Sequence, residues 1–348
     1  MEKKITIKEI AEKANVSPGT VDRVLHNRGE VSQKTRDKIL KIIRDGLYEP
    51  NIFARNLVLN KTYPIAALLP RHHEEDYWAS QARGILLADQ ELRAFGIQSN
   101  FYYFDEANPS SFDTEAENIL DTNVSAVLLA PVIYHKAKWL AQKCLEKGIP
   151  CIIIDSDIPK VDKLSFIGQN AFQSGYLAAK LLNYGGENKT VHLATITMAS
   201  DNNDILNQRK EGFMEYFRQT KQPVNIQACD LHAEDGAFDA LMEEFIAKIL
   251  PGDKIFVPNS KVHNIAAGLK KQNKAGKVAL IGYDLTPKNV QYLQEGVIDF
   301  LINQKPELQG YQGIQLLYKH LVLKQEVPKK VFMPLEIVTK ENIDYVSF

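Results

Sequence analysis

The sequence has few cysteines, no long apolar run and almost no net charge. Its three cysteines, Cys144, Cys151 and Cys229, include no closely spaced pair, so they indicate neither a disulfide framework nor a zinc motif, and we expect reduced thiols. No segment approaches the roughly 18 apolar residues of a membrane-spanning helix. The N-terminal segment MEKKITIKEIAEKAN is charged and lacks the apolar stretch of a signal peptide. These absences predict a cytoplasmic protein with no membrane partner.

Patterns of catalysis are missing as well. The sequence contains no nucleophile elbow, no Walker motif and no recognisable catalytic dyad. One cluster of potential metal ligands occurs, but its adjacent histidines point different ways and no second cluster supplies spaced ligands. That cluster comprises His72, His73, Glu74 and Asp76. We therefore expect no metal, no cofactor and no enzymatic activity.

Charge is distributed unevenly along the chain. Residues 1–62 carry 13 Lys and Arg against 8 Asp and Glu, a net of +5, whereas residues 63–348 carry 29 against 35, a net of −6. A basic head attracts phosphate groups through counterion release, and an acidic body opposes non-specific adhesion to nucleic acid. The asymmetry therefore favours DNA as the partner of the N-terminal region.

Residues 6–27, TIKEIAEKANVSPGTVDRVLHN, have the periodicity of two short helices joined by a tight turn. Thr6 and Glu9 have the spacing of a capping box at the start of the first helix. Ser17 is a suitable N-cap for the second helix, and Pro18 fits its first position because no hydrogen bond is lost there. The outward face of this helix carries short or polar side chains that can reach base edges in a major groove, namely Pro18, Gly19, Asp22, Arg23 and His26.

A third helix is expected between Ser32, as its N-cap, and Gly46 at its end. Small three-helix modules of this kind also occur in proteins that do not bind DNA. The basic charge of the head favours the DNA-binding interpretation.

Residues 5–57 resemble the DNA-binding head of the lactose-repressor/galactose-repressor family. The resemblance rests on TIKEIAEKANVS, TVDRVLHN, VSQKTRDKIL, LYEPN and ARNL, which form a long and specific motif. It implies a homodimer that binds operator double-stranded DNA. Asp22 departs from the family pattern, which usually has serine at this position. The implied DNA contacts are Thr6, Ser17, Pro18, Gly19, Thr20, Asp22, Arg23, His26, Asn27, Arg28, Asn51, Ala54, Arg55 and Leu57.

Residues 48–60, YEPNIFARNLVLN, contain a helix too short to be stable alone, since isolated helices below roughly 12–15 residues are marginal in water. The resemblance identifies it as a hinge helix that pairs with its two-fold mate in the minor groove. Leu57 then matches the leucine that wedges between base steps and kinks the duplex. The alternative is an ordinary linker with an exposed leucine.

From Tyr63 onward, short apolar runs alternate with helical stretches, which is typical of βαβ units around parallel sheets. The runs are IAALL (65–69), AVLLA (126–130), CIIID (151–155), VHLATI (191–196), KIFVP (254–258) and VALIGYD (278–284). Because this region is longer than a single core usually supports, we expect an α/β fold of two lobes with helices flanking each sheet.

This region resembles the type I periplasmic sugar-binding protein fold. The resemblance implies three crossings between the lobes, expected near 157–166, 303–309 and 330–335. The predicted organisation is a helix-turn-helix head (1–49), a hinge (50–62) and a two-lobed effector domain (63–348). Lobe one is expected to hold about 63–160 and 306–331, and lobe two about 161–305 and 332–348.

Ligands of such sheets lie beyond the carboxyl ends of the strands, so the residues after each apolar run are the candidate ligand contacts. They combine carboxylates, amides and a guanidinium, which bridge hydroxyl groups, with aromatic rings, which pack on the C–H face of a sugar. The predicted ligand-binding residues are Tyr77, Trp78, Asp155, Asp157, Arg209, Asn259, Asp284 and Gln304.

Each of these residues has a simpler alternative when it is taken singly. Asp155 could cap the next helix, Asn259 could be a turn residue, and Trp78 could belong to the core. Arg71, His72 and His73 leave room for an acidic sugar or a sugar phosphate, whereas the two aspartates favour a neutral one. The leading hypothesis is a transcription regulator controlled by a small-molecule effector, a sugar or sugar derivative. A transporter's solute-binding protein and a sugar-processing enzyme are the alternatives.

Overall fold

The computed structural model describes most of the chain, which divides into two units, Met1–Asn60 and Lys61–Phe348. The described residues are 5–25, 28–46, 61–184, 190–197, 204–221, 224–232 and 238–346. None of the helices within these ranges combines the length and apolarity that a bilayer crossing requires.

Three helices of the N-terminal unit begin where their capping residues predict. α1 spans Ile7–Ala14, and its N-cap Thr6 forms the expected capping box with Glu9. α2 spans Pro18–Leu25, and the Oγ of Ser17 accepts a hydrogen bond from the Thr20 N–H at 3.2 Å. α3 spans Gln33–Asp45, with Ser32 as N-cap and Gly46 as C-cap. The small core that joins them comprises Ile5, Ile10, Ala11, Ala14, Val21, Val24 and Ile39.

The second unit contains two six-stranded sheets, one for each lobe. The sheet of lobe one has the order β11-β5-β4-β3-β1-β2, with strands Lys330–Phe332, Ser165–Gly168, Cys151–Asp155, Ala126–Leu129, Tyr63–Pro70 and Ile97–Phe104. The sheet of lobe two has the order β12-β10-β9-β8-β6-β7, with strands Glu336–Val338, Phe300–Asn303, Ala279–Tyr283, Lys254–Phe256, Thr190–Thr197 and Asn225–His232. Pairing is parallel throughout except between β10 and β12.

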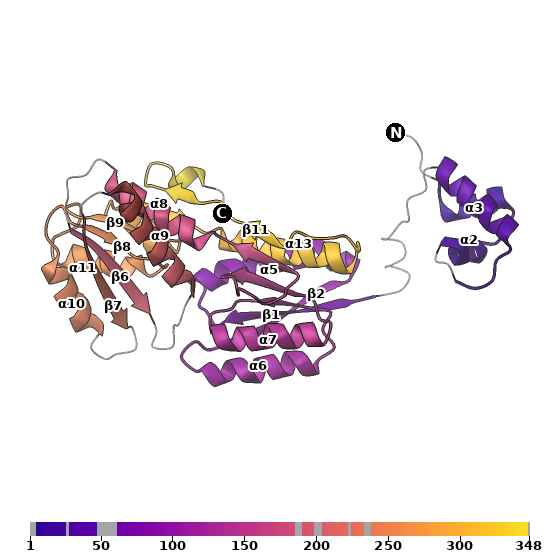
Figure 1. The fold of residues 1–348 in the computed structure, drawn as a ribbon, viewed down its shortest axis with the longest axis horizontal. Coiled ribbons are helices and arrows are strands. Elements are labelled where there is room, and N and C mark those ends of the chain that lie inside the picture. The colour runs from indigo at the N-terminus through magenta and orange to yellow at the C-terminus, as the bar shows by residue number, and fades with distance from the viewer. Residues whose placement is uncertain are drawn as a thin grey trace. The chain divides into compact units, whose positions relative to one another are not determined.

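Helices cover both faces of each sheet, as the α/β pattern predicts. In lobe one, α5 and α13 lie on one face, and α6 and α7 lie on the other (Figure 1). Their bounds are Tyr77–Leu92, Pro306–Leu321, Pro109–Asp121 and Tyr134–Glu146. In lobe two, α8 and α9 pack together, whereas α10, α11 and α12 cover the opposite side. Their bounds are Ala171–Asn183, Asp204–Thr220, Phe238–Lys248, Val262–Lys271 and Pro287–Gln294. Short 3₁₀ helices span Arg93–Phe95 and Ile343–Tyr345.

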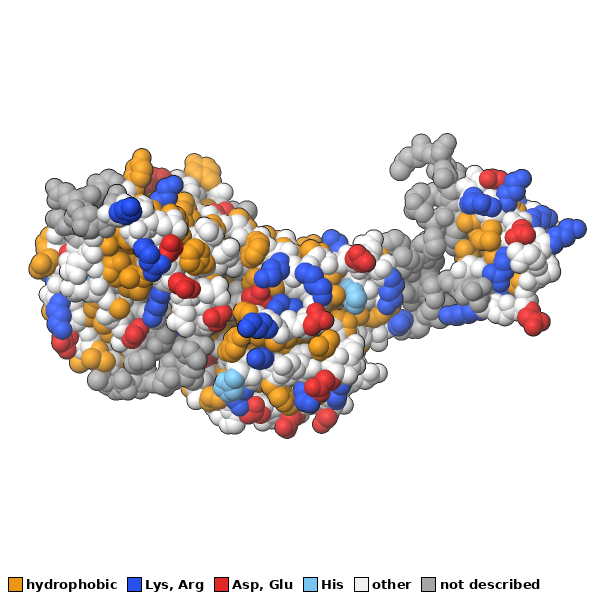
Figure 2. Space-filling model, in the orientation of Figure 1, with side chains coloured by type: hydrophobic (Ala, Val, Ile, Leu, Met, Phe, Trp, Pro, Cys, Tyr) orange, Lys and Arg blue, Asp and Glu red, His pale blue; other side chains and the backbone are white. Residues whose placement is uncertain are grey.

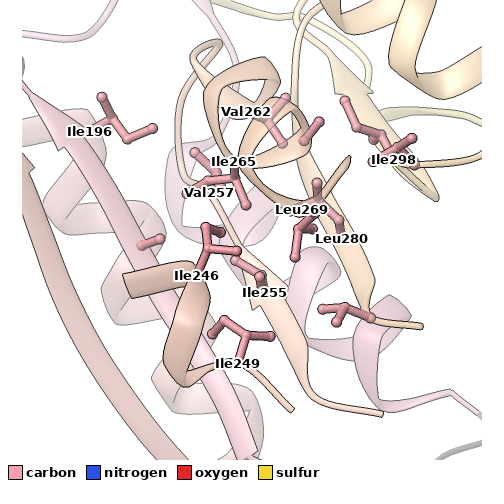
Figure 3. Packing of buried hydrophobic residues seen from close by; sticks show 14 of the residues in the cluster. Ile196, Ile246, Ile249, Ile255, Val257, Val262, Ile265, Leu269, Leu280 and Ile298 are labelled. Atoms are coloured by element: carbon pink, nitrogen blue, oxygen red, sulfur yellow. The ribbon is translucent and has the colours of Figure 1, made fainter. Parts of the chain in front are cut away.

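Each sheet buries a separate apolar core against its helices. In lobe two, the branched side chains of β8 and β9 interlock with those of α10 and α11 (Figure 3). Ile246, Ile255 and Leu280 are completely buried there. Packing of this kind fixes the strand ends, and therefore the side chains that follow them, in place.

The chain crosses between the lobes three times. The second crossing follows β10 and the third lies between β11 and β12, within the predicted segments 303–309 and 330–335. The first crossing falls after the predicted segment 157–166, and also after the predicted lobe boundary at residue 160. Because β5 pairs with β4 and β11, it belongs to lobe one, and the chain enters lobe two at Gln169 and Asn170. β11 likewise extends lobe one to Phe332.

Candidate functional site

A cavity of about 610 Å³ lies at the strand ends of the two lobes. Its volume is in the range of pockets that enclose a small molecule. Every predicted ligand-binding residue except Asp157 lines it, namely Tyr77, Trp78, Asp155, Arg209, Asn259, Asp284 and Gln304. We call it the main cavity.

Asp155 is the last residue of β4 and supplies a buried carboxyl group from lobe one. Its Oδ1 accepts a hydrogen bond from the Tyr77 hydroxyl at 2.6 Å, and its backbone N–H donates to Oε1 of Gln309 at 2.9 Å. Burial raises the pKa of Asp155, although the Tyr77 hydrogen bond and the charge of Arg209 act in the opposite direction. The carboxyl group is therefore oriented by the protein but not neutralised by an ion pair.

Asp284 follows β9 and supplies the carboxyl group of lobe two. Its Oδ2 accepts a hydrogen bond from Nε2 of Gln304 at 2.8 Å. Burial raises the pKa of Asp284 to about 7, against the lowering effects of Arg209 and of the Gln304 hydrogen bond. At neutral pH this side chain can therefore donate a hydrogen bond as well as accept one.

Arg209 supplies a buried guanidinium group whose charge acts on both carboxyl groups. It projects from α9 and is 2% exposed, and its Cζ lies 3.8 Å from the centre of the Tyr283 ring. Nη1 donates to the carbonyl oxygen of Pro258 at 2.8 Å, and Nη2 donates to Oε1 of Gln304. Its buried Nε has no hydrogen-bond partner among the described residues, so one donor is left for a ligand.

The aromatic and amide residues fall into different roles. Trp78 is half-buried in the cavity wall and meets the Tyr77 ring edge to face, with ring centres 5.0 Å apart. Asn259 also lines the cavity, but Nδ2 donates to the carbonyl oxygen of Ile196 and Oδ1 accepts from the backbone N–H of Lys261. Asn259 therefore shapes its turn, as the simpler alternative proposes, while it contributes to the wall.

Asp157 does not line the main cavity. It forms ion pairs with Lys163 and Lys330, and it lines a neighbouring cavity instead. Asp157 therefore lies apart from the other predicted residues, because two further residues along the chain bring its carboxylate to these lysines.

His72 and His73, the two histidines considered as metal ligands, do not line the main cavity. Their neighbours Arg71 and Asp76 do line it. The ring Nδ1 of His72 is 2.9 Å from the carbonyl oxygen of Pro70. Across the described residues, His, Cys, Asp and Glu side chains form no group of three that could hold a metal ion. Cys144 and Cys151 are buried free thiols, and Cys229 is a half-buried one.

Two buried glutamines that sequence reasoning missed connect the site to the crossings. Gln309 on α13 accepts the Asp155 N–H, and its Nε2 donates to the carbonyl oxygen of Gln304 at 2.9 Å. Gln169 donates from Nε2 to the carbonyl oxygens of Asn303 and Pro334, so one side chain links all three crossings. Gln169 directly follows a strand, which is the signal that would have identified it; Gln309 sits within a helix and carries no such signal.

The candidate DNA-binding surface is the exposed face of α2. Ser17, Pro18, Gly19, Asp22 and Arg23 are exposed there, while the opposite face of the helix is buried in the core. On the side of this unit visible in Figure 2, Lys and Arg side chains prevail over Asp and Glu. Thr6 and Arg28 are also exposed and Thr20 is half-buried. The other predicted contacts, His26, Asn27, Asn51, Ala54, Arg55 and Leu57, fall outside the described residues.

Comparison with known proteins relates both units to bacterial regulators. Residues 6–51 match the family of bacterial regulatory proteins of the lacI type, and residues 65–325 match a periplasmic binding protein domain. The HTH-type transcriptional repressor PurR of Escherichia coli is 24% identical over 97% of this chain and 96% of its own. The ribose operon repressor of Lactococcus lactis is 25% identical over 97% of this chain and 98% of its own.

Among solved structures, one assigned to a LacI transcriptional regulator from Bacteroides fragilis is 34% identical, with a TM-score of 0.76. That alignment covers 82% of this chain and all of the other. A glucose-galactose binding protein from Geobacillus stearothermophilus is 20% identical with a TM-score of 0.70, which shows a shared fold.

Proposed function

Because the chain belongs to the LacI family of bacterial regulatory proteins, we propose that it is a transcriptional repressor that binds operator DNA and responds to a sugar. The head binds DNA through α2, and the sugar binds in the main cavity. As a DNA-bound regulator it acts in the cytoplasm. The combination of an exposed polar α2 face with a buried cavity of converging carboxyl, amide and guanidinium groups carries this proposal.

The main cavity suits a neutral polyol better than an anion. Asp155 and Asp284 are both buried with raised pKa values, and Arg209 is the cation that faces both carboxyl groups. An anionic ligand would therefore meet two buried carboxyl groups beside Arg209, while the other cations of the cavity wall are Arg71, Lys261 and Lys288. Sugar hydroxyls, which donate and accept, match both protonation states of Asp284 and the open donor of Arg209.

We also propose that the functional form is a homodimer. A two-fold operator requires two heads, since each α2 reads one half-site. Leu86 and Leu87 on α5 are 47% and 45% exposed, and they offer adjacent apolar area to a second copy of the chain. A solute-binding role would account for the cavity but not for the basic head, so the repressor remains the better interpretation.

A ligand screen followed by a DNA-binding assay tests the proposed function. Pentoses, hexoses, uronates and sugar phosphates are screened by thermal shift, because a ligand at 100 times its Kd adds about 2.7 kcal/mol to stability. A sugar that stabilises the protein is then added to an operator-binding assay with wild type and Asp284→Ala. We expect Asp284→Ala to lose the sugar response while its ligand-free operator affinity stays unchanged.

Asp344→Ala, which removes an exposed carboxylate elsewhere in the same unit, is the matched control and should behave as wild type. An Asp284→Ala variant that keeps the full sugar response would reject the main cavity as the effector site. Absence of specific DNA binding by the wild type would reject the repressor proposal itself.

A further inference from the structure

A second cavity, of about 430 Å³, adjoins the main cavity. The two cavities share Asp155, Ser156 and Ile205 in their walls. Because both cavities use Asp155 and Ser156, a ligand that contacts Asp155 in the main cavity lies beside the second cavity. The two cavities together therefore offer more space to a ligand than the main cavity alone.

Both lobes contribute to the second cavity. Ser156 and Phe332 reach it from lobe one, whereas Asn170 and Gln208 reach it from lobe two. Asn170 caps α8, and Gln208 lies on α9, the helix that also carries Arg209. A ligand group in this space would therefore contact the same two lobes as a sugar in the main cavity.

Phe332 provides an aromatic surface in this cavity. The residue ends β11 at the edge of the lobe-one sheet and is 55% exposed, which is unusual for so large an apolar side chain. Its ring meets the buried Phe166 ring edge to face, with centres 6.4 Å apart and planes at 78°. Edge-to-face contact holds the ring in place and leaves a face open, which suits stacking against the C–H face of a sugar.

Gln169 leaves one buried acceptor without a partner. Its Nε2 donates hydrogen bonds to the carbonyl oxygens of Asn303 and Pro334, at 2.8 and 2.7 Å. Its Oε1 has no hydrogen-bond partner among the described residues, although the side chain is 2% exposed. A buried acceptor of this kind is stabilised by a donor such as a hydroxyl group.

Two of the three lysines that line the second cavity, Lys163 and Lys330, are paired with Asp157, and Lys160 is the third. Nζ of Lys163 contacts the Asp157 carboxylate and the carbonyl oxygens of Ile158 and Val161, so its three donors are occupied. Lys330 binds the other oxygen of Asp157 at 3.0 Å. Lysine charge that is already paired gives little attraction for an anion, whereas aromatic and amide groups bind a neutral ring.

We infer that the second cavity binds the second sugar ring of an oligosaccharide, stacked on Phe332, while the first ring occupies the main cavity. This inference rests on the proposed function and specifies its ligand class: the effector is a disaccharide or longer glycan rather than a free monosaccharide. The shared wall at Asp155 and Ser156 carries the linkage between the rings.

Calorimetric titration of the full-length protein with sugars of increasing length tests this inference. The probes are matched pairs: glucose with maltose and cellobiose, xylose with xylobiose, mannose with mannobiose, galactose with galactobiose, and galacturonate with digalacturonate. We expect one disaccharide to bind about tenfold or more tightly than its monosaccharide. Phe332→Ala should weaken binding of that disaccharide about tenfold and leave monosaccharide binding unchanged, because only the second ring loses its stacking partner.

Tyr345→Ala is the matched control, because it removes an 87% exposed aromatic ring that lines neither cavity. Equal affinity for both members of every pair, or an equal loss for both on Phe332→Ala, would overturn the inference and leave the proposed function intact. A preference abolished by Lys160→Gln and Lys330→Gln but not by Phe332→Ala would show anion recognition, and would also overturn it. If no sugar binds at all, the proposed function fails as well.

Discussion

Asp155 and Asp284 occupy equivalent positions in the two lobes. Asp155 ends β4 and Asp284 directly follows β9, and both have left-handed backbone conformations, with φ of 70° and 68°. Residues other than glycine rarely adopt this conformation, and aspartate and asparagine tolerate it best. Both side chains line the main cavity, so the same local geometry presents one carboxyl group from each lobe.

The raised pKa of Asp284 predicts a pH-dependent stability of the ligand-free protein. In the folded protein Asp284 keeps its proton up to about pH 7. In the unfolded chain its pKa has the ordinary aspartate value of 3.8, so the proton is lost at lower pH. The folded state therefore binds more protons between these values, and the unfolding free energy falls as pH rises from about 4 to about 7, by about 4 kcal/mol. Asp284→Asn should remove this fall.

Urea unfolding of both proteins at several pH values between 4 and 8 measures the difference. Asparagine suits the backbone conformation at position 284, so the variant should fold. Groups that do not interact with Asp284 titrate alike in both proteins and cancel when the two curves are subtracted, whereas Asp155, whose charge raises the pKa of Asp284, changes with it. Parallel stability curves for wild type and Asp284→Asn would contradict the assigned pKa.

Arg209 should be required for stability and ligand binding together. In Arg209→Ala, Gln304 and the Pro258 carbonyl lose their buried donor, and two buried carboxyl groups lose their common cation. Loss of two hydrogen bonds from a charged donor, each worth about 1.5–3 kcal/mol, costs about 3–6 kcal/mol. We expect a decrease of this size in the unfolding free energy, measured in urea, and no detectable sugar binding by calorimetry.

Arg209→Lys separates the two effects. Lysine keeps the positive charge but lacks the planar guanidinium group that stacks on Tyr283 and fixes the directions of the two hydrogen bonds, so it should recover part of the stability without sugar binding. Lys210→Ala, on the neighbouring position of α9, is the control; its surface pair with Asp230 contributes about 1 kcal/mol or less. Full sugar affinity in Arg209→Lys would show that charge alone is sufficient at this position.

Each strand that follows from the apolar runs lies inside its sheet, although the short buried strand β5 was missed, because a crossing between the lobes was expected there. β1, β3 and β4 lie inside the lobe-one sheet and read as continuous apolar runs. β2 and β7 were missed because they are edge strands, with polar residues among the apolar ones, as in IQSNFYYF. Missing β2 also concealed the cavity-lining residues Asp105 and Ala107 that follow it.

The site residues show a similar limit. Asp155, Asp284 and Gln304 were found because a parallel sheet brings its strand ends to one edge, whatever the sequence separation. Only one of the two ion-pair partners of Asp157 is near it in the sequence, because Lys163 is six residues away, whereas Lys330 is 173 residues away and reaches Asp157 through the edge strand β11. Local spacing identifies which residues follow strands, but distant packing determines which of them face the cavity.

Two glycines set the distance between α8 and α9, and therefore the position of Arg209. A Cβ on Gly175 would lie 1.9 Å from the Arg209 carbonyl oxygen, and a Cβ on Gly212 would lie 1.9 Å from that of Phe172. Backbone atoms cannot move aside as the end of a flexible side chain can, so Gly175→Ala must push α8 and α9 apart. We expect lower thermal stability and, because Arg209 moves, weaker sugar binding in calorimetric titration.

Lys180→Ala, on the exposed side of α8, is the control and should leave both properties unchanged. A Gly175→Ala variant with wild-type stability and sugar affinity would show that the helices separate without displacing the guanidinium group. Operator binding without ligand should stay intact in either variant, since the head has its own core.

The last prediction concerns Asp22, where the chain departs from the usual pattern of its family. Asp22 is exposed on α2, between the buried Val21 and the exposed Arg23. A carboxylate near DNA is repelled by phosphates. It is tolerated if it only tunes affinity, or if it accepts a hydrogen bond from cytosine N4, the major-groove partner of an acceptor-only side chain.

Replacement of Asp22 by serine distinguishes these two roles. If the carboxylate only repels phosphate, Asp22→Ser should tighten binding by a similar factor for every operator variant. If it reads cytosine, the substitution should cost about 1–3 kcal/mol at one C·G pair in each half-site and little elsewhere. Binding to all single-base operator variants at fixed salt measures the pattern. Glu12→Ser removes an exposed carboxylate from α1 and controls for net charge, so a position-specific loss confined to Asp22→Ser supports direct reading, and a uniform gain rejects it.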